Sequence, residues 1–201
     1  MNVTAKSWAS QTTFPWFGSR STPGPASSTS GLNSRSALTI WVTWPLTLHL
    51  ADGLPAAPQA FLCDAKLLAW TLHWDFHQTF RDPLHLFHAN LFYPAAYTLA
   101  LSEHVYGVAL IGFPLFAAGW SSLTAYNVLL LLGMAASALA AWALARYLTG
   151  DAMASLLAGV VYSFVPWQLF RLVHLHYHWG AFMALALLFL LRYLDGVGDA
   201  T

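Results

Sequence analysis

The chain has 201 residues, a formal net charge of zero, 58% hydrophobic residues and only 8% charged residues. Soluble domains carry about 25% charged residues, so this composition excludes an ordinary soluble protein and predicts a polytopic membrane protein. No cluster of lysine or arginine occurs, which argues against nucleic acid as a partner.

Residues 1–35 are rich in serine, threonine, proline and glycine and lack an apolar core. We expect a disordered cytoplasmic tail here, because such a segment cannot bury enough surface to fold alone. The first apolar run begins near Ala37, and residues 36–54 are predicted to form a first, short span.

Three more spans are predicted at 121–147, 152–170 and 179–193. Ser121–Ala145 has no charged residue over 25 positions, more than the roughly 20 that a helix needs to cross a bilayer. If the spans alternate, the basic residues that flank them fall on one side, which the positive-inside rule places in the cytoplasm. These residues are Lys6, Arg20, Arg35, Arg146 and Arg192. The predicted fold is an all-α bundle of about four spans in a bacterial inner membrane, with a large external loop at 55–120.

The predicted spans contain few polar residues, chiefly Asn127, Ser137 and Tyr162. This scarcity disfavours a transport pathway, which requires polar groups near the middle of the membrane. Small residues four positions apart, such as Ser155 and Gly159, predict close packing between helices.

The segment from Asp52 to Trp120 holds five of the eight acidic residues and five of the nine histidines, so we expect the chemistry of the protein here. An amphipathic surface helix is predicted from Asp64 to His77. One face of that helix carries Leu67, Trp70, Trp74 and His77. Val105–Trp120 is apolar but only 16 residues long, which suits an interfacial or re-entrant helix better than a span.

Asp64 and Glu103 are the candidate catalytic residues, because both carboxylates stand at the predicted start of a surface helix. Each could stabilise its helix, Asp64 as an N-cap and Glu103 through the helix dipole. Alternatively, Asp64 could act as a general base for a hydroxyl group, with Glu103 assisting or binding a divalent cation. The sequence does not decide between these structural and catalytic roles, and it does not show whether a divalent cation is needed.

Arg171 and His174 follow the third predicted span and are candidates for binding a phosphate, because guanidinium matches phosphate oxygens. His174 and His178 are four residues apart and could instead bind a metal, although no third ligand is evident nearby. The single cysteine, Cys63, is interpreted as a bystander, since nothing around it resembles a tuned thiolate site.

A series of motifs from Asp64 almost to the end of the chain forms a recognisable pattern. They are Asp64 with Leu67, Ala69, Trp70 and Trp74-Asp75; Asp82–Pro94; Thr98–His104; Ala125–Asn127; Arg146–Gly150; and Ala158-Gly159 through Pro166 to Arg171 and His174. This pattern resembles a bacterial family of polytopic membrane proteins with the C-type glycosyltransferase (GT-C) architecture.

The resemblance implies an enzyme that transfers a sugar from a polyprenyl-phosphate donor to an acceptor on the external face. It maps the presumed catalytic base onto Asp64 and a second acidic residue of the same loop onto Glu103. It also implies that basic or histidine residues near the external surface meet the donor phosphate, for which Arg171 and His174 are candidates.

The chain departs from the family pattern in several places. Ala65-Lys66 replaces an expected proline or other small residue, Leu68 replaces an asparagine, and His88 replaces an aspartate. Proteins of this architecture have many more than four spans, so we expect this chain to be an amino-terminal fragment. Two other readings compete with the enzyme: a non-catalytic transporter or envelope-assembly partner, and a structural membrane fragment.

Overall fold

The computed structural model describes residues 37–55, 62–92 and 94–198, so the predicted tail at 1–35 lies outside the described residues. Within these ranges the chain forms helices and no β-strand, and the predicted all-α class is confirmed. After a short helix at 37–42, the elements in chain order are η1 (Leu46–Leu48), α2 (Leu62–Arg81), η3 (Pro83–His85), η4 (Thr98–Leu101), α3 (Tyr106–Ala117), α4 (Ser122–Thr149), α5 (Ala152–Phe164), α6 (Pro166–Phe170), η5 (Leu175–Trp179) and α7 (Ala181–Gly198).

Three helical stretches of the described chain are long and apolar enough to cross a membrane. They are Ser122–Thr149, Ala152–Phe170 and Leu175–Gly196. These stretches match the spans predicted at 121–147, 152–170 and 179–193. The second bends at Val165, which adopts an extended backbone before Pro166 begins α6.

The first predicted span, 36–54, does not form one continuous helix in the described residues. The helix at 37–42 ends before Pro45, and only the three-residue η1 follows. Proline lacks the backbone N–H that a continuing helix needs. The carbonyls of Leu50 and Gly53 instead accept hydrogen bonds from Asn127 Nδ2 at 2.9 and 2.8 Å. The described residues therefore form three helices of membrane-spanning length, and a bundle of four spans is not confirmed.

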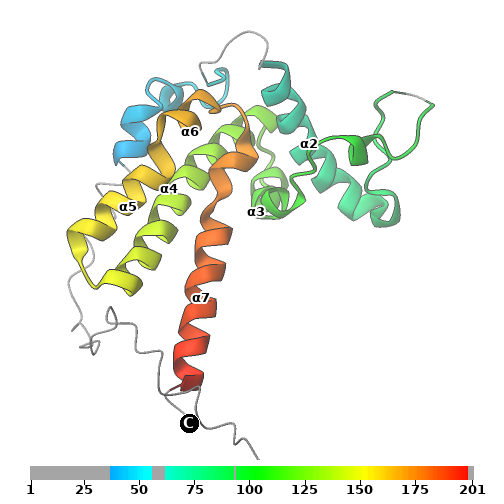
Figure 1. The fold of residues 1–201 in the computed structure, drawn as a ribbon. Coiled ribbons are helices and arrows are strands. Elements are labelled where there is room, and N and C mark those ends of the chain that lie inside the picture. The colour runs from blue at the N-terminus through cyan, green and yellow to red at the C-terminus, as the bar shows by residue number, and fades with distance from the viewer. Residues whose placement is uncertain (1–36, 56–61, 93, 199–201) are drawn as a thin grey trace, which may run out of the picture.

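Helix α4 is the centre of the molecule and packs against both α5 and α7 (Figure 1). The chain reverses between α4 and α5, where Gly150 adopts a left-handed conformation with φ of 68°. At the opposite end from α2 and α3, Tyr147 of α4 donates a hydrogen bond to Asp195 of α7, and Arg192 lies over the Tyr147 ring. Arg146, the residue before Tyr147, and Arg192 therefore lie at the same end of the bundle, as the prediction of alternating spans requires.

Close packing of α4 against α5 depends on small residues. A Cβ atom at Gly159 would lie only 2.6 Å from the carbonyl oxygen of Ala138. Gly133 has a similar role towards η5, since a Cβ there would lie 2.7 Å from Trp179 Nε1. The small-residue spacing thus brings helix backbones together, as the sequence predicted.

The outer faces of these helices expose large apolar side chains. They include Met153, Leu157 and Val161 on α5, and Met183, Leu187 and Leu190 on α7. Apolar surface of this extent is unfavourable in water and favourable in lipid. These exposed apolar faces are therefore suited to contact with lipid, as in a membrane protein.

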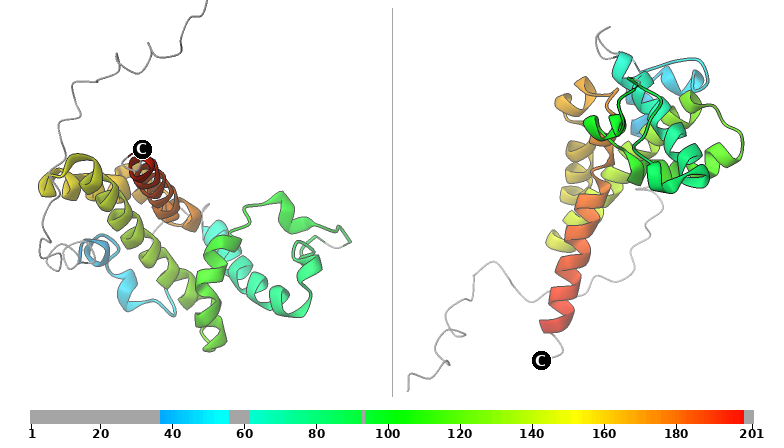
Figure 2. Two further views of the ribbon diagram at one scale, coloured as in Figure 1. Left: turned by 90° about the horizontal axis from the view of Figure 1, so that it is seen from below. Right: turned by 90° about the vertical axis from the view of Figure 1, so that its right-hand side faces the viewer.

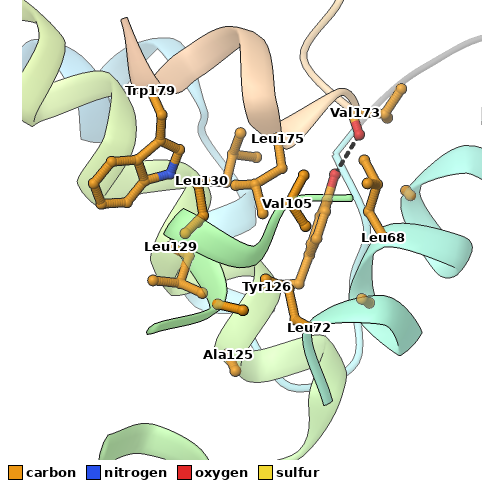
Figure 3. Packing of buried hydrophobic residues seen from close by; sticks show 14 of the residues in the cluster. Leu68, Leu72, Val105, Ala125, Tyr126, Leu129, Leu130, Val173, Leu175 and Trp179 are labelled. Carbon is orange, nitrogen blue, oxygen red and sulfur yellow. Dashed lines mark hydrogen bonds between the residues drawn. The ribbon is translucent and has the colours of Figure 1, made fainter. Parts of the chain in front are cut away.

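Helices α2 and α3 pack together at the end of the bundle where α4 begins, as both views of Figure 2 show. Leu68 and Leu72 of α2 share a buried cluster with Leu129 and Leu130 of α4 (Figure 3). The packed face of α2 thus differs from the predicted one, because Trp70 and Trp74 are only partly buried and stack with their centroids 5.4 Å apart. Helix α3 has 12 residues, a rise of about 18 Å, and is too short to span a bilayer.

We expect Gly159→Leu to destabilise the protein by about 1–3 kcal/mol, because the side chain would force α5 away from α4. Gly196→Ala is the matched control, since nothing lies within 4 Å of the Cβ position there. Thermal unfolding in detergent measures both variants. Equal melting temperatures for Gly159→Leu and the wild type would contradict the close packing of these helices.

Candidate functional site

Helix α2, the segment before α3 and the connection from α6 to α7 meet at one end of the bundle (Figure 1). Each of these segments ends or bends there. Side chains from parts of the chain that are distant in sequence therefore lie near one another. This end lies opposite the end that carries Tyr147 and Asp195.

Asp64 and His174 are brought into direct contact. Asp64 Oδ2 lies 3.3 Å from His174 Nε2, and the two side chains are 47% and 9% exposed. Asp64 lies inside the first turn of α2 rather than at its N-cap, because the helix already includes Leu62. The carboxylate thus faces both the positive end of the helix dipole and an imidazole, while half of it stays open to a ligand.

Helix α4 fixes the segment that carries His174. Tyr126 Oη donates a 2.6 Å hydrogen bond to the carbonyl of Val173, which Figure 3 shows at the edge of the buried cluster. Ser137 Oγ donates to the carbonyl of His178 at 2.7 Å and accepts from the backbone N–H of Ala181 at 2.9 Å. These buried bonds satisfy backbone groups outside regular helix and hold the connection against the bundle.

Glu103 is exposed and does not contact Asp64 in any described interaction. It lines an open depression of about 370 Å³. The depression is bounded by Glu103, His104, Val105, Gly107, Val108, His176, Trp179 and Phe182. Of the two predicted catalytic carboxylates, Asp64 therefore contacts His174, whereas Glu103 lines the depression together with His176.

Asp75 and His104 form a buried pair that sequence reasoning did not single out. His104 Nε2 lies 2.8 Å from Asp75 Oδ1, and the Asp75 side chain is completely buried. Burial raises the pKa of Asp75 above its usual 3.8, and the hydrogen bond and charge of His104 oppose that rise. The one signal in the sequence was the charged side chain of Asp75 on an otherwise apolar face of a predicted helix. Its partner could not be predicted, because His104 comes from a different element.

The alternative in which His174 and His178 bind a metal finds no support in the described residues. His174 contacts Asp64, whereas the ring of His178 lies 3.4 Å from the carbonyl of Arg171. No group of three or more His, Cys, Asp or Glu side chains in the described ranges is arranged to hold an ion. Arg171 ends α6 directly before this segment, and Cys63 is exposed in the first turn of α2.

The chain was compared with known families, proteins and structures. No protein-family model matches it, and neither a curated protein nor a solved structure matches it. The GT-C resemblance therefore rests on the motifs themselves. The site combines a half-exposed carboxylate, Asp64, with the imidazole of His174 at one end of three apolar helices.

Asp75→Asn should remove part of the pH dependence of stability. Because the pKa of Asp75 is raised by folding, its protonated form contributes stability that is fully present below pH 3.8 and is lost as pH rises through the raised value. Melting temperatures measured upward from pH 3.5 should therefore fall more in the wild type than in Asp75→Asn. Asp82→Asn, at an exposed carboxylate, is the control. Parallel curves for wild type and Asp75→Asn would contradict the assignment.

Proposed function

We propose that this protein is a membrane glycosyltransferase of the GT-C type, or the amino-terminal part of one, which transfers a sugar from a polyprenyl-phosphate donor to an acceptor. The observation that carries the proposal is the contact between Asp64 and His174, which joins the candidate base to the candidate phosphate-binding segment. A donor of this kind is part lipid and part phosphate. Its site should lie where polar residues meet the end of apolar helices.

Asp64 is the proposed general base. Its oxygen takes the proton of the acceptor hydroxyl as that hydroxyl attacks the anomeric carbon. The bond from the anomeric carbon to the phosphate oxygen breaks, and its electron pair leaves with the polyprenyl phosphate. Glu103, which lines the adjoining depression with His176, assists by orienting the acceptor.

Arg171 and His174 are proposed to bind the departing phosphate. Both belong to the connection between α6 and α7, which Tyr126 and Ser137 hold in place. A fixed guanidinium and imidazole would stabilise the charge that develops on the phosphate without having to reorganise. The proposed partners are thus membrane lipid and the polyprenyl-phosphate sugar. A divalent cation bound with the substrate remains compatible with this scheme.

The membrane orientation follows from the two ends of the bundle. The proposed location is the bacterial inner membrane, with the end that carries Arg146 and Arg192 in the cytoplasm and the Asp64 end outside. The exposed apolar faces of α5 and α7 would then contact lipid.

Asp64→Asn should lower sugar transfer by about 10²–10⁴-fold, because it removes the base and keeps the shape of the side chain. The assay follows transfer from a panel of polyprenyl-phosphate sugars in membranes that contain the expressed protein. Asp82→Asn is a matched control, since Asp82 also pairs with a histidine, His85, at 2.8 Å but lies elsewhere. Full activity of Asp64→Asn, or no transfer by the wild type from any donor, would favour the non-catalytic reading, in which Asp64 only stabilises α2.

Cys63 provides a direct test of orientation. It is the only cysteine, it is exposed, and it precedes Asp64. A membrane-impermeant maleimide added to intact spheroplasts should label Cys63 to the same extent as in lysed membranes. A Cys63→Ser variant with a new cysteine at Leu148, at the other end of α4, should be labelled only after lysis. The reverse pattern would place the site in the cytoplasm.

A further inference from the structure

The open depression beside Glu103 has no role in binding the donor phosphate, although it adjoins the proposed site. None of the residues that line it is lysine or arginine, and Glu103 contributes a negative charge. An anionic ligand would be repelled there. The depression therefore fits a neutral ligand better than a phosphate.

Its walls combine aromatic and polar groups. Trp179 and Phe182 stack with centroids 5.5 Å apart and planes at 20°, and Phe182 is 51% exposed. Glu103, His104 and His176 supply hydrogen-bonding groups on the same depression. A sugar ring has C–H groups on its faces and hydroxyls around its rim, so it matches an aromatic wall with a few placed polar groups.

His104 is the most firmly placed of these polar groups. Its Nε2 pairs with the buried Asp75 Oδ1 at 2.8 Å, so Nδ1 is the ring nitrogen outside this pair and the one a ligand can use. The ring is further fixed by stacking on Tyr106, with centroids 5.6 Å apart and planes at 10°. Tyr106 Oη in turn lies 3.1 Å from Thr79 Oγ1 on α2. A side chain ordered in this way before binding loses little entropy when the ligand arrives.

We propose that this depression is the acceptor site, that it takes a neutral sugar, and that His104 binds a sugar hydroxyl through Nδ1 while Asp75 positions the imidazole. The assignment of the depression as the acceptor site rests on the proposed function, whereas the binding of a neutral sugar there does not.

The test measures binding rather than transfer. A panel of neutral methyl glycosides is titrated against the full chain in nanodiscs, and affinity is read by saturation-transfer NMR. The wild type should bind at least one member. His104→Ala should weaken that binding at least tenfold, and Phe182→Ala should weaken it several-fold. His85→Ala, at an exposed histidine outside the depression, should stay within about twofold of the wild type.

Two variants separate positioning by Asp75 from a purely structural role. Asp75→Ala should lose binding as His104→Ala does, whereas Asp75→Asn, which can still accept from Nε2, should retain most of it. No binding of any glycoside by the wild type, or unchanged binding by His104→Ala, would overturn the inference. Glycoside binding without transfer from any donor would refute the proposed function alone.

Discussion

The contacts that α4 makes with the chain between α6 and α7 hold the candidate site together. That connection leaves regular helix for several residues, and its backbone polar groups must be satisfied where water is scarce. Tyr126 and Ser137 satisfy three of them, at Val173, His178 and Ala181. Together with the burial of Val173, Leu175 and Trp179 in the core cluster, these bonds fix the position of the connection relative to α2.

The polar residues of the candidate site are arranged around this connection. Its His174 contacts Asp64, and its His176 lines the depression together with Glu103. The Asp75–His104 pair then ties α2 to the segment before α3. An isolated buried carboxylate is costly, so a paired one marks a place where the chain maintains a specific geometry.

The polar residues of the spans therefore have a role other than the one their scarcity suggested. Asn127, Ser137 and Tyr162 all donate to backbone carbonyls of neighbouring segments, the last to Gly180 at 3.1 Å. They fasten irregular segments to the bundle.

The sequence by itself determined the helical class, the three long apolar helices and the small residues where they pack, because hydrophobic runs and residue size act locally along a helix. It also selected Asp64, Glu103, Arg171 and His174, but could not show which of them meet. The tertiary structure decided that Asp64 contacts His174 while Glu103 lies beside His176. It also decided that 36–54 is not one helix and that Asp75 pairs with His104. These outcomes depend on packing between elements distant in the chain, which no local pattern encodes.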